Sequence, residues 1–200
     1  QIPHAVRSAF RAMTTGRPGA THICLPYDVQ KHALDPAEVW AQPGHDRFPA
    51  YRSAPDPAAV AEAADRLVAA RSPVLICGGG VVIAGATAAL DALATLLNAP
   101  VCTSVSGQGS LADNHPLNVG VVGTNGGVDA TRAVVAQADL VLFIGARAGS
   151  TTTEHWQMPS RKVTIVHLDV DPLTLGTNHR PAVALVGSAP LRPQAPPAPV

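Results

Sequence analysis

The sequence predicts an α/β protein built on a parallel β-sheet with helices on both of its faces. Three observations support this prediction. Short apolar segments alternate along the chain with amphipathic segments that have the period of an α-helix. The apolar segments lack the polar–apolar alternation of half-exposed strands, which is typical of strands buried on both faces. Glycine-rich loops follow several of these segments, as tight strand-to-helix turns require.

The composition argues against several classes of function. The 200 residues include 14 basic and 14 acidic side chains, so net charge gives no reason to expect nucleic acid or a membrane surface as partner. No apolar run approaches the roughly 18 residues of a membrane-spanning helix, and we expect a cytoplasmic protein. The eight histidines show no metal-binding spacing, so no metal site is predicted. The cysteines lie in apolar runs without a Cys-x-x-Cys pair, which predicts buried free thiols at Cys24, Cys77 and Cys102.

The first part of the chain is expected to be a partial α/β piece, residues 1–30. Apolar residues recur at helical spacing over 2–14, and the apolar segment 21–26 predicts a short buried strand that ends at Pro26. A helix and one strand do not make a domain, so we interpret this piece as the end of a longer α/β unit. Residues 31–55 are rich in Pro, Asp, His and Arg without a sustained period, and they are predicted to be a linker between domains.

Regular alternation begins at Asp56, which is a suitable N-cap for a helix that starts at Pro57. Five strands are predicted, at 74–78, 100–105, 139–147, 162–171 and 182–188. Further helices are predicted near 85–97, 128–137 and, as a short one, 172–176. Residues 56–188 therefore form the main domain. The proline-rich residues 189–200 are predicted to be an extended or disordered tail.

The loops after these strands are the candidate site, because the carboxyl ends of parallel strands meet at one edge of the sheet, where ligands bind. The loops are GGG at 78–80, SGQG at 106–109, GVVGTNGG at 120–127, GAR at 145–147 and DVD at 169–171. Backbone amides in such loops can approach a phosphate, which suggests a nucleotide-shaped ligand. The alternative is that the glycines only make tight turns.

The pattern disfavours a nicotinamide-dependent oxidoreductase. The spacing of Gly78, Gly80 and Gly85 departs from G-x-G-x-x-G, and the second strand ends without an acid for the ribose. Asp169 and Asp171 either accept hydrogen bonds from a ribose or cap the following helix. Arg147 either pairs with a diphosphate or makes a surface salt bridge. His115, which precedes a proline, is expected to close a turn, and no residue is predicted to be catalytic.

Taken together, these segments resemble the thiamine-diphosphate-dependent enzymes of the acetolactate synthase and 2-oxo acid decarboxylase type. GRPGATHICLPYDV resembles the end of that family's pyrimidine-binding domain. Its central domain is matched by RSPVLICGGGV, NAPVCTSVSGQGSLADNHPLNVGVVG, ADLVLFIGAR and VTIVHLDVDPLTLGTNHRPAVALVG. The resemblance covers roughly residues 2–187. It implies a Rossmann-like, doubly wound sheet of about six strands.

The resemblance also implies a function for a parent enzyme. That enzyme would be a transferase or lyase that uses thiamine diphosphate and Mg²⁺ on 2-oxo acids or an acyl-CoA, as a homodimer or tetramer. The family's catalytic glutamate region and its GDG motif are absent from these 200 residues. We therefore expect the chain to be inactive by itself and to have the parent's remaining domains as partners.

In relatives the central domain binds FAD or an ADP moiety, or is empty. The matching positions in this chain are Gly78, Gly79, Gly80, Gly109, Gly123, Arg147, Asp169 and Asp171. Two departures weaken FAD in particular: the segment AGSTTTEHW after the GAR, and Ser188 where an Asp is usual. The alternative from another class is a stand-alone, non-catalytic nucleotide-binding or interaction module.

Overall fold

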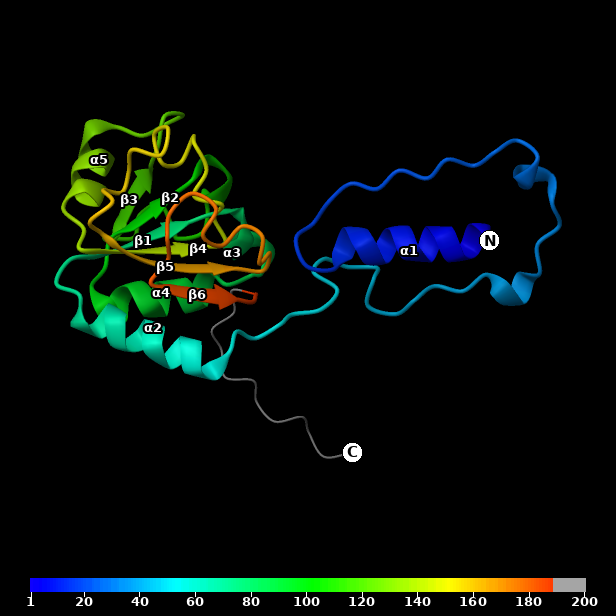
Figure 1. The fold of residues 1–200 in the computed structure, drawn as a ribbon, viewed down its shortest axis with the longest axis horizontal. Coiled ribbons are helices and arrows are strands. Elements are labelled where there is room, and N and C mark those ends of the chain that lie inside the picture. Colours follow the sequence, from blue (N-terminus) through cyan, green and yellow to red (C-terminus); the bar gives the residue numbers. More distant parts are fainter. Residues whose placement is uncertain (189–200) are drawn as a thin grey trace. The chain divides into compact units, whose positions relative to one another are not determined.

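The computed structural model describes residues 1–188 and divides into two compact units (Figure 1). The first unit is Gln1–Arg52, and the second begins at Ser53. The predicted tail at 189–200 lies outside the described residues. Each unit is described by itself.

The first unit has one α-helix and two short 3₁₀ turns. The elements are α1 (Ile2–Thr14), η1 (Val29–Lys31) and η2 (Pro36–Glu38). The helix predicted over 2–14 is confirmed, but the strand predicted at 21–26 is wrong. A strand needs a neighbour to satisfy its backbone groups, and none of the described residues pairs with this segment. Cys24 is consequently exposed and not buried as predicted.

Over its described residues, 53–188, the second unit is a six-stranded parallel sheet with four α-helices, which confirms the predicted fold class. The strands are β1 (Pro73–Cys77), β2 (Val101–Thr103), β3 (Asn118–Val121), β4 (Leu140–Ile144), β5 (Thr164–Asp169) and β6 (Val183–Val186). The helices are α2 (Pro57–Ala69), α3 (Gly79–Ile83), α4 (Thr87–Leu97) and α5 (Asp129–Ala136), and η3 (Val105–Gly107) follows β2. Asp56 is the predicted N-cap: its carboxylate accepts hydrogen bonds from the amides of Ala58 and Ala59.

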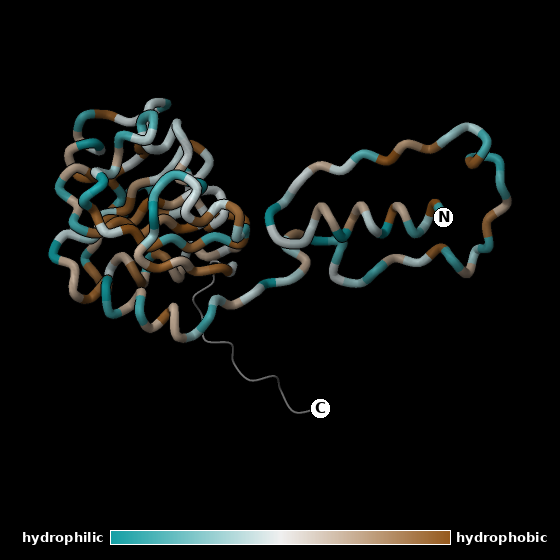
Figure 2. The backbone as a smooth tube through the Cα atoms, in the orientation of Figure 1, coloured by the Kyte–Doolittle hydropathy of each residue, from teal (hydrophilic) through white to brown (hydrophobic). Residues whose placement is uncertain are grey.

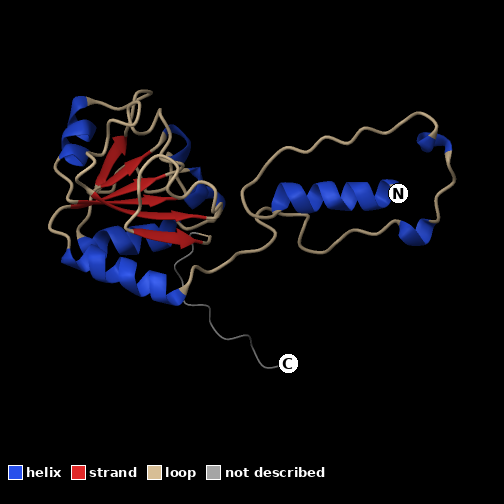
Figure 3. Cartoon of the chain, viewed as in Figure 1, coloured by secondary structure: helices blue, strands red, loops and turns tan. Residues whose placement is uncertain are grey.

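The strand order is β3-β2-β1-β4-β5-β6, that of a doubly wound Rossmann-like sheet. All neighbouring pairs are parallel. Helices α2 and α4 cover one face and α5 covers the other (Figure 3). Strand order reverses between β1 and β4, because the chain returns there to the other side of β1.

Three elements of the second unit differ from those that the sequence predicts. The edge strand β3 was not predicted, because it is short, contains Gly120 and is only half-buried. Gly79 and Gly80 open the short helix α3 instead of a loop. Residues 172–176 form turns and not the predicted helix. The carboxylates of Asp169 and Asp171 accept backbone N–H groups two residues ahead, and such bonds favour turns over helix.

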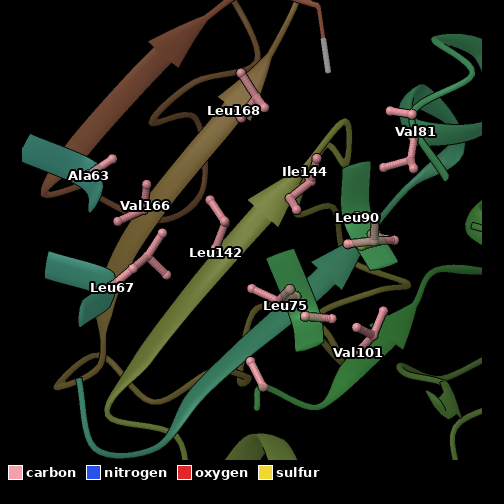
Figure 4. Close-up of a cluster of buried hydrophobic side chains, with 14 of the residues drawn as sticks. Ala63, Leu67, Leu75, Val81, Leu90, Val101, Leu142, Ile144, Val166 and Leu168 are labelled. Atoms are coloured by element: carbon pink, nitrogen blue, oxygen red, sulfur yellow. The ribbon is translucent and has the colours of Figure 1, made fainter. Parts of the chain in front are cut away.

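The core has two layers, one on each face of the sheet, and the strands are its most hydrophobic segments (Figure 2). Figure 4 shows the layer in which α2 and α4 pack on Leu75, Leu142 and Val166. The second layer centres on Phe143 and is covered by α5 and by the segment that follows β4. Successive residues of each strand enter opposite layers, which explains why every residue of β1 and β4 is apolar and buried.

Candidate functional site

The candidate site is the carboxyl edge of the sheet at the point between β1 and β4 where the strand order reverses. In open α/β sheets ligands bind at this place. The structure puts two of the predicted loops there, Gly78–Gly80 after β1 and Gly145–Arg147 after β4, because β1 and β4 pair over their whole length. Whether the loops leave room for a ligand depends on how closely their backbones approach each other.

The backbones of these two loops are in direct contact. A Cβ atom added at Gly78 would lie 2.2 Å from the carbonyl oxygen of Gly145, and one at Gly80 would lie 2.7 Å from the Gly145 Cα. Gly145 has a φ of +54°, and a Cβ there would in turn lie 2.7 Å from the Gly80 Cα. Glycine is therefore required at these positions by packing within the chain.

Two amides of the same loop and the one that follows it are also engaged within the chain. The Gly78 N–H donates to the carbonyl of Ile144 at 2.9 Å, and the Gly80 N–H donates to that of Gly145 at 3.1 Å. The Val81 N–H donates to the carbonyl of Gly78. A phosphate cradle needs amides that are not already donating. The run of three glycines is thus explained without a ligand.

The other predicted glycines serve similar purposes. A Cβ at Gly79 would lie 3.1 Å from the carbonyl of Ser106, so α3 packs tightly on the loop after β2. Gly123 has a φ of +102°, and a Cβ there would lie 2.0 Å from the carbonyl of Thr151. Gly109 has a φ of +82° with open space around it, so only its backbone conformation favours glycine.

The predicted polar residues do not converge on one point. Arg147 is exposed, and its guanidinium makes no hydrogen bond or ion pair with another residue in 1–188. Asp169 is buried and accepts the Asp171 N–H at 2.9 Å, while Asp171 accepts the Leu173 N–H at 3.0 Å. Both aspartates accept amides of the turn after β5, and the helix that they were expected to cap does not form.

His115 closes a turn, as predicted. Its Nδ1 accepts the Leu117 N–H at 3.1 Å, and the backbone N–H of His115 donates to the carbonyl of Ala112. Its Nε2 also lies 3.3 Å from a carboxylate oxygen of Asp91. The ring therefore links the loop before β3 to α4.

Two features of this edge were missed by sequence reasoning. The first is a left-handed turn after β4, in which Glu154, His155 and Trp156 all have positive φ values. Side-chain bonds hold this turn: Arg132 of α5 donates to Glu154, and Ser150 is hydrogen-bonded to His155. No local sequence signal predicts three consecutive left-handed residues that are not glycine.

The second missed feature is a pair of histidines near Phe143. His167 is 2% exposed, and its Nε2 lies 2.7 Å from the carbonyl oxygen of Ala146. Burial lowers the pKa of His167, against the opposing effects of that hydrogen bond and of Asp169. Burial also lowers the pKa of His179, and His167 and Arg161 lower it further. The only advance signal was the polar residue His167 inside an apolar strand.

Cys77 and Cys102 are buried free thiols, as predicted. Cys77 belongs to the core layer under α2 and α4, whereas Cys102 belongs to the layer under α5, so the sheet separates them. Burial raises the pKa of each thiol to about 12, which leaves too little thiolate for reaction near neutral pH. Neither thiol is a candidate nucleophile.

Over 1–188, no group of three or more His, Cys, Asp and Glu side chains is placed to hold a metal ion. In the same part of the chain, no helix has the length and apolar character needed to cross a membrane.

Comparison with known proteins gives a consistent result. Residues 60–192 match the family model described as thiamine pyrophosphate enzyme, central domain. A probable acetolactate synthase large subunit of Methanocaldococcus jannaschii is 36% identical over 94% of this chain and 32% of its own length. The glyoxylate carboligase of Escherichia coli O157:H7 is 32% identical over 94% of this chain and 31% of its own length. The chain thus spans about a third of the length of these relatives.

Solved structures show the same fold. A putative thiamin diphosphate-dependent enzyme from Mycobacterium smegmatis aligns with a TM-score of 0.73 and 26% identity, over 94% of this chain and 35% of the other. Benzoylformate decarboxylase from Polynucleobacter necessarius aligns with a TM-score of 0.75 over 95% of this chain and 34% of the other. The identity in the second case is 23%, so that likeness concerns the fold alone.

Proposed function

The chain belongs to the thiamine pyrophosphate enzymes as their central domain, and from this membership we propose that it is the middle segment of a larger carboligase or decarboxylase. The substrates proposed for that enzyme are 2-oxo acids, with an acyl-CoA as the second possibility. The names of the relatives carry the proposal, since acetolactate synthase and glyoxylate carboligase both appear among sequences that match nearly the whole chain.

Thiamine diphosphate supplies an electron sink for carbanions in such reactions. In our proposal the cofactor and its Mg²⁺ are held by parts of the enzyme other than this chain, which lacks a GDG motif. Residues 1–30 are proposed to be the end of the pyrimidine-binding domain, residues 31–55 the linker, and residues 56–188 the central domain. We further propose a cytoplasmic homodimer or tetramer. A stand-alone module is not favoured, because the relatives named above are enzymes by name.

Within that enzyme we propose that the central domain acts as a scaffold. Support comes from the carboxyl edge, where the three glycines of the loop after β1 pack against other backbone segments and the Gly78 and Gly80 amides donate within the chain. The end of β6 is also covered: the Ser188 N–H donates to the carbonyl of Ser53 at 2.8 Å, and a Cβ at Gly187 would lie 2.6 Å from Pro55. The position where FAD-binding relatives usually have an Asp thus holds Ser188, which is bonded to Ser53.

Binding of FAD or an ADP moiety is the alternative, and calorimetry separates the two. The purified chain is titrated with FAD and, separately, with ADP. A scaffold shows no saturable heat with either ligand at micromolar concentrations. Micromolar or tighter binding of one of them, lost in Arg147→Ala, would instead establish a working nucleotide site at this edge. Because Arg147 is exposed, its replacement leaves the fold unchanged.

The proposed enzyme activity is tested on the whole protein that contains this segment. We expect turnover of a 2-oxo acid such as pyruvate, measured as CO₂ release, only when thiamine diphosphate and Mg²⁺ are both present. A protein that binds thiamine diphosphate but does not turn over any 2-oxo acid or acyl-CoA would contradict the proposed reaction. The scaffold proposal is independent of that outcome, because it is tested by nucleotide titration of the chain itself.

A further inference from the structure

Three aromatic rings from different parts of the chain gather beside β4 and β5. Phe143 of β4 and His167 of β5 are paired residues of neighbouring strands, with ring centroids 5.5 Å apart. His179, from the segment between β5 and β6, stacks on the Phe143 ring; the two ring centroids are 6.0 Å apart and the interplanar angle is 28°. Phe143 is thus flanked by two titratable rings.

The hydrogen bonds of the two histidines indicate which protonation state this arrangement favours. The carbonyl oxygen of Ala146 can only accept, so the Nε2 of His167 at 2.7 Å carries the hydrogen. The Nε2 of His179 is buried and has no hydrogen-bond partner among the described residues. A neutral imidazole tolerates one such unsatisfied atom, but an imidazolium of this half-buried ring would have a buried N–H donor at Nε2 without an acceptor.

The surrounding charges act in the same direction on His179. Asp169 at the end of β5 acts on His167, and Arg161 before β5 acts on His179, as does His167 itself. Asp169 favours a proton on His167, whereas burial opposes it. Burial, His167 and Arg161 all lower the pKa of His179, so a proton on His167 makes a charged His179 still less favourable.

The residue next to His179 in the sequence, Asn178, joins two segments of the chain. The side-chain amide of Asn178 donates to the carbonyl of Ala148 at 3.1 Å, which joins the segment after β5 to the segment after β4. Ala148 has a φ of +46°, and the left-handed turn at 154–156 follows in the same segment. Residues in this region of backbone conformation are strained and keep it only while their surroundings hold them.

We propose that His179 is an acid-released latch: while both histidines are neutral, its ring on Phe143 holds the segment 171–181 against the segment 145–149, and proton uptake frees both segments. The charged ring reaches solvent when it leaves Phe143, and this movement removes the Asn178 bond to Ala148. The strained segment after β4 then relaxes, while the strands stay paired.

The sign of the pH dependence follows from the two lowered pKa values. The latched state binds fewer protons than the open state, because histidine in the open state titrates near its ordinary value of about 6.5. Latching is therefore at full strength above about pH 6.5, and it weakens as the pH falls below that value.

Amide hydrogen exchange of the full chain at pH 7.5 and pH 5.0, corrected for intrinsic exchange rates, tests the latch. Amides of 146–149 and 173–180 are expected to lose about tenfold in protection at pH 5.0, relative to those of β1; tenfold corresponds to one pKa unit. His179→Phe keeps a ring on Phe143 without a titratable group, so its protection should not change between the two pH values. His4→Gln, at an exposed histidine of α1, should behave like the wild type.

A second variant keeps the test decisive if His179→Phe does not fold, which circular dichroism at pH 7.5 would reveal. Arg161→Gln removes an exposed cation that opposes protonation of His179, and it should move the opening to lower pH. The latch is overturned if the wild type shows no acid-induced loss of protection in these segments. It is also overturned if His179→Phe shows the same loss as the wild type, or if Arg161→Gln leaves the opening pH unchanged.

Discussion

Replacement of Gly78 by alanine tests the conclusion that the glycines after β1 serve packing within the chain. The new Cβ would lie 2.2 Å from the carbonyl oxygen of Gly145 and 2.7 Å from the Ala146 Cα. Real Cβ atoms essentially never approach closer than 3.0 Å, and both neighbours are backbone atoms that cannot rotate away. The carboxyl ends of β1 and β4 must therefore move apart.

The expected cost follows from two contributions. Overpacking of this kind costs about 1–3 kcal/mol. Separation of the strand ends also weakens the Gly78 bond to Ile144 and the Gly80 bond to Gly145, each of which contributes about 1 kcal/mol. We therefore expect Gly78→Ala to lower the free energy of unfolding by about 3–5 kcal/mol.

Urea denaturation followed by circular dichroism measures this loss, with Gly149→Ala as the matched control. Gly149 lies in the same domain, has no atom within 4 Å of an added Cβ and does not have a positive φ. Its replacement should change stability by less than about 1 kcal/mol. If the two variants unfold at the same urea concentration, the packing argument is wrong, and the glycines would then need a ligand to explain them.

Three further predictions concern the core, a turn and the thiols. Leu75→Ala should cost about 2–5 kcal/mol in the same urea assay because Leu75 is fully buried, whereas Leu96→Ala, at a side chain 81% exposed, should cost almost nothing. The carboxylate of Asp139 accepts hydrogen bonds from the two amides before β1, and these bonds lower its pKa. Its contribution to stability is therefore present above about pH 4 and lost as the pH falls further. Asp139→Asn should flatten the acid end of the stability–pH curve, and an unchanged curve would contradict this. Burial raises the pKa of the two thiols on β1 and β2 to about 12. At pH 8 a thiol reagent should therefore label Cys24 alone in the native chain and all cysteines in denaturant, as measured by mass spectrometry. Rapid labelling of a second thiol in the native chain would refute this prediction.

Local patterns were sufficient for the elements that are long, apolar or capped. The strands β1 and β4 are continuous apolar runs, β5 is largely apolar, and α2 begins where Asp56 and Pro57 indicate. Edge strand β3 escaped because it contains a glycine and buries little of its surface, so its place in the sheet depends on pairing with β2. The strand expected at 21–26 failed for the converse reason, since its apolar residues find no partner strand among the described residues.

The candidate site was anticipated only as a list of loops. The sequence correctly indicated that the loops after β1 and β4 meet, because that follows from parallel strands. It left open whether Gly78 and Gly80 contact a ligand or the chain. It also left open whether Asp169 binds a ribose or caps a following helix. The structure shows a Gly145 backbone against the first two and the Asp171 amide on the third.

By itself, the sequence determined the α/β class, the main helices and strands, and the resemblance to a family, because apolar periodicity and capping residues act over a few neighbours in the chain. Tertiary structure alone decided the contact of Gly78 with Gly145 and the gathering of Phe143, His167 and His179. These contacts join residues 24 to 67 positions apart. They depend on strand order and on close backbone approach, and no local pattern encodes either one.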